Sequence, residues 1–188
     1  MQLDVKKRET VKKKDPKRLR REGAIPAVLY GLGKEGGEAH ALSIDAGAFK
    51  SHLRKIPSGR LSTAIFDLKG DGVHTKAIVK DIQYHVVSYD VLHLDFQALE
   101  KGKEITVNVP VVLTGVVDCV GVKQGGLLNQ PLRYISVRCP TTEIPEVFSV
   151  NVKDLMPEQA IKVSDLKVAD SVKVMNRAGD VVVIVAKK

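Results

Sequence analysis

Short runs of β-branched and other apolar residues recur along almost the whole chain, and within each run apolar and polar residues alternate. Successive side chains of a strand point to opposite faces, so this alternation is typical of half-buried β-strands. Gly, Pro, Asn or Asp separates the runs, as at turns. A mainly β fold is therefore predicted. The predicted strands are residues 27–30, 40–44, 62–68, 75–83, 91–99, 105–113, 132–137, 147–152 and 171–186.

The last of these runs is interrupted by residues 176–179, with sequence NRAG. A four-residue connection with Gly late in the turn is typical of a β-hairpin. We therefore expect the two parts of this run to be the paired arms of a hairpin.

Two helices are predicted between the strands. Asp45 can cap a helix over residues 46–55, where Phe49 and Leu53 share one face and Ile44 stands where a hydrophobic staple packs on Phe49. Asp15 can cap a second helix that starts at Pro16 and ends at Gly23 in the left-handed conformation. This second helix contains Leu19 as its single apolar residue, so most of it should face outward.

Positive charge is concentrated at the start of the chain. Residues 1–21 hold ten Lys and Arg against three acidic residues, which places +7 of the total net charge of +8 in this segment. In a helix, Lys17, Arg20 and Arg21 would share one face, and their mutual repulsion would be relieved by a polyanion. The alternative is a solvated tail, but the density of charge exceeds what solubility requires.

Nucleic acid fits this segment better than a membrane surface, which would require several apolar side chains opposite the charges. Aromatic residues make up 4% of the chain and Trp is absent, so a platform for stacking single-stranded bases is poorly supplied. The composition therefore favours recognition of a duplex by its shape and backbone. No run of about 18 apolar residues is present to span a bilayer.

Few features indicate catalysis or a cofactor. Cys119 and Cys139 lack the spacing of zinc ligands and are predicted to be buried thiols of a reducing cytosol. Residues 31–36 fit a dinucleotide-binding fingerprint, but a strand-like run follows where that fingerprint requires a helix, so a loop is expected. We therefore predict that the chain is not an enzyme and binds neither cofactor nor small-molecule substrate; the enzymatic alternative depends on the loop over residues 31–37.

His85, His93 and Asp95 lie on neighbouring strand-like segments and could converge on one face. Three interpretations stay open from the residues alone: a metal or acid–base site, the exposed polar rim of a barrel, and contacts to RNA.

A change of composition near residues 98–103 predicts two domains, residues 1–99 and 100–188, each large enough to fold alone.

Residues 17–31, KRLRREGAIPAVLYG, closely resemble the signature of the large-subunit ribosomal protein twenty-five family, whose long members are called general stress protein CTC. Residues 80–85 (KDIQYH) and 92–96 (LHLDF) agree with it. The second half resembles the extra domain of the long members at residues 121–126 (GVKQGG), 144–145 (IP) and 163–166 (VSDL). The chain departs from the family at residues 12–16 and at Val86, where a proline is common.

The resemblance implies a small N-terminal β-barrel with short helices, followed by a second mainly β domain. It implies that the barrel binds the loop E region of 5S rRNA. It also implies a monomer on the cytoplasmic ribosome, with large-subunit proteins as further neighbours. Carried over by position and joined to the basic helix, the expected RNA-binding residues are Arg8, Lys13, Lys17, Arg18, Arg20, Arg21, Tyr30, Gln83, His85, His93 and Asp95.

The resemblance and the charge together favour a structural protein of the large (50S) ribosomal subunit that binds 5S rRNA through its basic segment and barrel face. The alternative is a stress-related interaction protein whose C-terminal domain docks a protein partner. The apolar runs over residues 105–113 and 181–185 would supply the surface for that alternative, although a β core also accounts for them.

Overall fold

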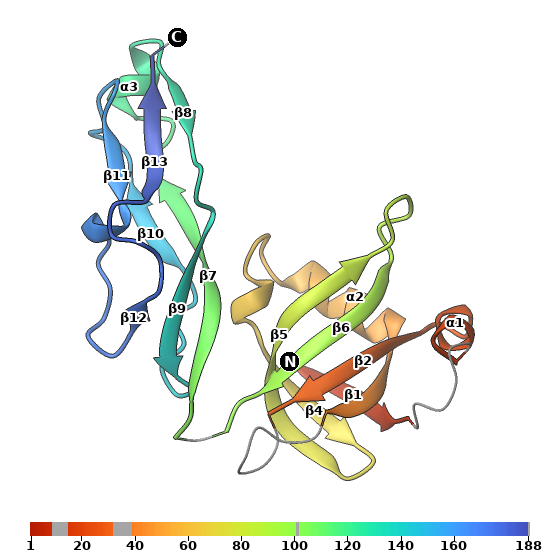
Figure 1. The fold of residues 1–188 in the computed structure, drawn as a ribbon. Coiled ribbons are helices and arrows are strands. Elements are labelled where there is room, and N and C mark those ends of the chain that lie inside the picture. Colours follow the sequence, from red (N-terminus) through yellow and green to blue (C-terminus); the bar gives the residue numbers. More distant parts are fainter. Residues whose placement is uncertain (9–14, 32–38, 101, 188) are drawn as a thin grey trace. The chain divides into compact units, whose positions relative to one another are not determined.

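The computed structural model describes residues 1–8, 15–31, 39–100 and 102–187, and it is mainly β (Figure 1). The chain forms two compact units, Met1–Lys103 and Glu104–Lys188. The elements of the first unit are β1 (Gln2–Lys7), α1 (Asp15–Arg21), β2 (Ala24–Tyr30), β3 (His40–Asp45), α2 (Ala46–Lys55), the 3-10 helix η1 (Leu61–Thr63), β4 (Ile65–Gly70), β5 (Val73–Tyr84) and β6 (Val91–Ala98). Those of the second are β7 (Glu104–Thr114), α3 (Val120–Lys123), β8 (Leu127–Asn129), β9 (Tyr134–Pro140), β10 (Phe148–Asn151), β11 (Ala160–Lys162), the 3-10 helix η2 (Val163–Asp165), β12 (Lys173–Val174) and β13 (Val181–Ala186).

The first unit is a closed barrel with strand order β1-β3-β2-β6-β5-β4 (Figure 1). The circle is completed by β1, which pairs antiparallel with β3 and parallel with β4. The sequence pattern did not predict β1, because this strand has only two apolar residues, Leu3 and Val5, and most of its other residues are charged. Both are almost fully buried. The start of the basic segment is therefore part of the barrel wall.

The barrel core is closed from one side by α2. Asp45 caps this helix as predicted, because its Oδ2 accepts a hydrogen bond of 2.7 Å from the amide of Ala48. Phe49 is fully buried, and its ring lies 6.1 Å from that of Phe66, which in turn meets Phe96 edge-on at 6.1 Å. Such aromatic pairs add stabilisation to the burial of their area.

The basic helix α1 ends as predicted. Gly23 has a φ of 81°, which a residue with a Cβ adopts only at a cost, and its amide bonds the carbonyl of Arg20. The helix begins at Asp15, one residue before the predicted start. None of the seven residues described in α1 is buried, in agreement with the expected outward-facing helix.

The second unit contains two sheets, with strand orders β10-β7-β9-β12 and β11-β13-β8. Their inward side chains form the core. The two free cysteines, Cys139 on β9 and Cys119 directly before α3, are buried as predicted, and burial raises the pKa of Cys139. The apolar runs of β7 and β13 supply most of their alternate side chains to this core, so they offer little support for a docking surface.

Two predictions about the strands were wrong. The expected hairpin over residues 171–186 does not form, because β12 pairs with β9 whereas β13 pairs with β11 and β8. The side chain of Asn176 accepts a hydrogen bond of 2.8 Å from the amide of Ser136 on β9, which holds the first arm in the other sheet. The strand expected from residue 62 begins only at Ile65, because Thr63 bonds back to the carbonyl of Arg60 within η1.

The glycines of residues 121–126 allow backbone segments of the second unit to approach closely. The amide of Gly126 bonds the carbonyl of Gly121, and the amide of Gly121 bonds the carbonyl of Leu155, both at 2.9 Å. A Cβ on Gly121 would lie 2.8 Å from the carbonyl oxygen of Leu155 and 2.9 Å from Cγ1 of the buried Val185. Neither neighbour can move freely, so only glycine fits there.

We expect Gly121→Ala to lower the free energy of unfolding by about 1–3 kcal/mol through overpacking. The measurement is urea denaturation of the full-length chain, monitored by circular dichroism. Gly179→Ala is the matched control, because a Cβ there meets nothing within 4 Å, and its effect should stay within about 0.5 kcal/mol. Equal stability of Gly121→Ala and the control would contradict the packing argument.

Candidate nucleic-acid interface

Three strands, β2, β6 and β5, run side by side in the barrel wall (Figure 1). Their outer face carries polar side chains. Alternate residues of β6, including Leu94 and Phe96, are fully buried, so His93 and Asp95 point outward. Gln83 of β5 is the register partner of His93, and paired residues share a face. Tyr30, 42% exposed, ends β2 on the same face, next to β6.

A β-bulge at Lys80 brings Gln83 onto this face. The pairing of β5 with β6 shifts between Val79 and Asp81, so one extra residue is accommodated there. After the bulge, Ile82 packs against the barrel core and Asp81 and Gln83 are exposed. Without the extra residue the alternation would turn Gln83 inward, so the bulge sets the polar face of β5.

His93 and Asp95 form a close pair on this face. His93 Nδ1 is buried and lies 2.7 Å from Asp95 Oδ1, although the angles at this contact do not make it a hydrogen bond. The side chains are 20% and 28% exposed, so each keeps part of its polar surface available to a ligand.

The cations beside this face come from α1 and the residue that follows β1. Arg20 Nε donates a hydrogen bond of 2.9 Å to the carbonyl of Leu92, and Arg8 Nε donates one of the same length to the carbonyl of Leu42. These bonds hold both guanidinium groups against the barrel. Each group has further N–H donors that these bonds do not use.

The surroundings of Arg8 shift the pKa of its guanidinium group. Its pKa is lowered first by burial and second by the positive charge of Arg20, whereas Asp15 raises it. The two guanidinium groups are therefore close enough to repel each other while both remain charged. A phosphate placed between them would relieve this repulsion.

The remaining cations of α1 are exposed. Lys17, Arg18 and Arg21 all face solvent, and Arg18 pairs with Glu22 one turn away at 3.6 Å. Arg18, Arg20 and Arg21 lie in the last turn, where positive charge is favourable to the helix dipole, and Asp15 lies in the first. Exposed pairs such as Arg18 with Glu22 contribute little to stability, so these cations can be recruited by a ligand at low cost.

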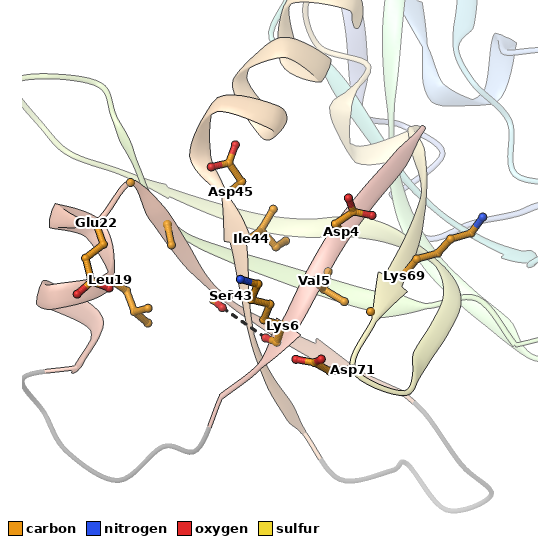
Figure 2. Close-up of a pocket in the computed structure, with 13 residues that line it drawn as sticks. Asp4, Val5, Lys6, Leu19, Glu22, Ser43, Ile44, Asp45, Lys69 and Asp71 are labelled. Atoms are coloured by element: carbon orange, nitrogen blue, oxygen red, sulfur yellow. Dashed lines mark hydrogen bonds between the residues drawn. The ribbon is translucent and has the colours of Figure 1, made fainter.

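On another side of α1 lies a groove of about 690 Å³ bordered by β1, β3 and the β4–β5 turn (Figure 2). Figure 2 shows Leu19 and Glu22 of α1 at one edge and Asp4 and Asp71 at the other. With Asp45, four carboxylates line the groove, whereas only two ammonium groups do, those of Lys6 and Lys69. This excess of negative charge disfavours RNA, so the groove limits the extent of the basic surface.

The turn that joins β5 to β6 is anchored at its base. Asp90 Oδ1 lies 2.7 Å from Lys50 Nζ of α2, and the pKa of Asp90 is lowered by the hydrogen bond from Lys50 and next by one from Ser88. His85 Nδ1 accepts a hydrogen bond of 3.2 Å from the amide of Ser88, so one ring nitrogen of this predicted RNA-binding residue is used inside the turn.

The structure brings most of the predicted site residues to one region of the first unit. Tyr30, Gln83, His93 and Asp95 share the outer face of the barrel, Arg8 and Arg20 flank it, and the rest of α1 adds exposed cations. Lys13 and most of the loop over residues 31–37 lie outside the described residues. Sequence reasoning missed Asp81 and Gln97, which the register places opposite Asp95 and Tyr30. Asp81 required knowledge of the bulge, whereas the alternation of β6 beyond Asp95 was a signal for Gln97.

Other kinds of site find little support among the described residues. No three His, Cys, Asp or Glu side chains gather there in an arrangement that could hold a metal ion. The segment after the glycine-rich loop is β3, so the loop does not open the helix that a dinucleotide fingerprint requires. No helix in this part of the chain is long and apolar enough to cross a membrane.

Comparison with known proteins assigns both halves of the chain. Residues 3–96 match the model of the Ribosomal L25p family, and residues 104–188 match that of the C-terminal domain of ribosomal protein TL5. The chain is 42% identical to the large ribosomal subunit protein bL25 of Chlamydia muridarum. It is 41% identical to that of Chlamydia trachomatis serovar L2 and 37% identical to that of Chlamydia pneumoniae. Each alignment covers 188 residues, the whole of both chains.

We expect Lys50→Ala to raise the pKa of Asp90 toward the ordinary value of an aspartate, because it removes the largest cause of the lowering. Carboxyl NMR titration measures this, with the exposed Lys55→Ala of the same helix as control. Since the pKa is lowered in the folded state, the ion pair contributes fully above the ordinary pKa and its contribution is lost as the pH falls through the lowered one. An unchanged Asp90 titration in Lys50→Ala would contradict this anchor.

Proposed function

Since the chain belongs to the long, two-domain form of the Ribosomal L25p family, we propose that it is a structural protein of the large ribosomal subunit rather than an enzyme. Its place is then the ribosome in the bacterial cytoplasm. We assign RNA binding to the first domain, residues 1–99. The second domain, residues 100–188, is the C-terminal extension of the long members.

The RNA partner that we propose is 5S rRNA, bound at its loop E region. One observation carries this proposal: a polar strip of Tyr30, Gln83, His93 and Asp95 lies on the barrel wall with Arg8 and Arg20 held beside it. Such a strip can enter a groove while the cations contact the phosphates on its borders. The exposed Lys17, Arg18 and Arg21 extend the phosphate contacts along α1.

The chemistry of the strip fits an RNA minor groove. A-form RNA has a wide and shallow minor groove that presents 2′-hydroxyl groups and base edges. Asp95 can accept a hydrogen bond from a 2′-hydroxyl or an exocyclic amine, and Gln83 can both donate and accept. Contacts from arginine to phosphate orient the protein but carry little sequence information. Discrimination among RNAs is therefore the task of the strip, and affinity that of the cations.

The proposal predicts a steep salt dependence and a defined role for Arg20. If cations neutralise about six phosphates, the logarithm of the affinity for 5S rRNA should fall with the logarithm of the salt concentration at a slope of about −4 to −5. Arg20→Ala should weaken binding by about 1–3 kcal/mol and reduce the slope by about 1. Fluorescence anisotropy with labelled 5S rRNA measures both quantities.

The control for Arg20→Ala is Arg54→Ala, which removes an exposed arginine from α2 instead. Its affinity and slope should match those of the unmodified chain. The melting temperatures of both variants should change little, because both side chains are exposed. A flat salt response of the unmodified chain would reject the proposed function.

A second variant tests the polar strip. Asp95→Ala should leave phosphate contacts intact but remove a groove acceptor, so it should reduce the preference for 5S rRNA over a plain RNA duplex by about 1–3 kcal/mol. Asp4→Ala removes an exposed carboxylate from the acidic groove and serves as control for the change of net charge. If the preference is unchanged by Asp95→Ala, this residue does not belong to the interface.

A further inference from the structure

The turn between β5 and β6, residues 85–90, exposes three apolar side chains together. Val86 is 87% exposed, Val87 82% and Tyr89 78%, which makes them the most exposed large apolar residues described in the first unit. A turn that only reverses the chain is usually built from Gly, Asn, Asp or Ser. A cluster of exposed apolar side chains on a protruding turn is instead typical of a contact surface.

Hydrogen bonds within the turn hold its backbone in one arrangement. The amide of His85 bonds the carbonyl of Asp90 at 2.8 Å, and the amide of Tyr89 bonds the carbonyl of His85 at 2.9 Å. Asp90 also forms an exposed ion pair with Lys50 of α2, which lies outside the turn. A surface that is already ordered loses less conformational entropy on binding, so even a small contact can contribute to affinity.

Backbone strain at Tyr89 also distinguishes this turn. Its φ is 55°, in the left-handed region, which costs a bulky residue free energy that glycine would not lose. The chain nevertheless has an aromatic residue there, with most of its side chain in solvent. The strained backbone displays the Tyr89 side chain where glycine would offer none.

The charge of the turn indicates which class of partner it fits. Residues 85–90 contain neither Lys nor Arg, and their one acidic residue, Asp90, is paired with Lys50. RNA-binding surfaces are strongly positive, as α1 is here, whereas the centres of protein interfaces are depleted of charge and enriched in aromatic residues. Val86, Val87 and Tyr89 therefore fit an uncharged pocket on a protein.

The position and size of the turn restrict that protein further. The turn lies beside Arg20, one of the proposed phosphate contacts, since Arg20, His85 and Ser88 line one cavity of about 330 Å³. Three side chains are far fewer than the 20–30 residues per partner of a stable interface, so this contact cannot hold a protein alone. A partner bound to the same RNA would be present at high effective concentration, which makes a small contact sufficient.

We infer that this apolar turn, formed by Val86, Val87 and Tyr89, docks into an apolar pocket of a second protein of the large ribosomal subunit. The inference rests on the proposed function, because the shared RNA holds the two proteins together. It assigns the protein contact to the first domain rather than to the C-terminal one.

The first experiment is site-specific photocrosslinking in large subunits that carry the full-length chain with p-benzoylphenylalanine in place of Val87. Crosslinking to one defined peptide of one ribosomal protein is expected. The same probe in place of Gln97, on the polar face of the barrel, should crosslink to rRNA. Crosslinks of the Val87 probe to rRNA, or none at all while the Gln97 probe reacts, would overturn the inference.

The second experiment uses the combined variant Val86→Ser, Val87→Ser, Tyr89→Ser. Its affinity for isolated 5S rRNA should equal that of the unmodified chain, whereas its release from large subunits should be at least about 10-fold faster. Equal release rates would overturn the inference and leave the RNA proposal intact. If the unmodified chain itself fails to bind 5S rRNA, the proposed function is what fails. Thermal melting checks that the variant is folded.

Discussion

Closure of the barrel by β1 is the constraint on which the rest of the first unit depends. This strand pairs with β3 on one side and β4 on the other, and it contributes only Leu3 and Val5 to the core. Once the circle is closed, each strand has one face toward the core and the other toward solvent. Arg8 directly follows β1, so the same pairing that closes the barrel also positions the most buried of the proposed phosphate contacts.

The proposed RNA surface separates affinity from recognition in space. Arg8 and Arg20 are held by backbone carbonyl groups and repel each other in the free protein, so a phosphate both gains hydrogen bonds and relieves repulsion. The polar strip between β2 and β5 has few charges of its own. Carboxylates line the groove on the other side of α1, where they disfavour RNA. The apolar turn after β5 lies next to this surface but differs from it in chemistry, which is why we assign it to another class of partner.

Local sequence patterns predicted much of the molecule. The alternation of apolar residues located most strands, Asp45 located the start of α2, and the charge of residues 1–21 indicated a polyanion as partner. Each of these signals is contained within a few adjacent residues. The predictions were wrong where the outcome depends on distant residues. β1 has too few apolar positions to be recognised alone, and the two arms around residues 176–179 joined different sheets, because β12 pairs with β9 whereas β13 pairs with β11 and β8.

The candidate site shows the same division. The sequence by itself determined the kinds of residue present, the concentration of cations near the N-terminus and the family to which the chain belongs, because these are properties of composition and order. Only the tertiary structure decided that Gln83 faces outward beside His93, that the guanidinium groups of Arg8 and Arg20 bond to carbonyl groups of the barrel, and that Val86, Val87 and Tyr89 are exposed in one turn. The physical reason is that strand register, β-bulges and barrel closure are set by pairing between segments far apart in the chain, and no local pattern encodes the partner of a strand.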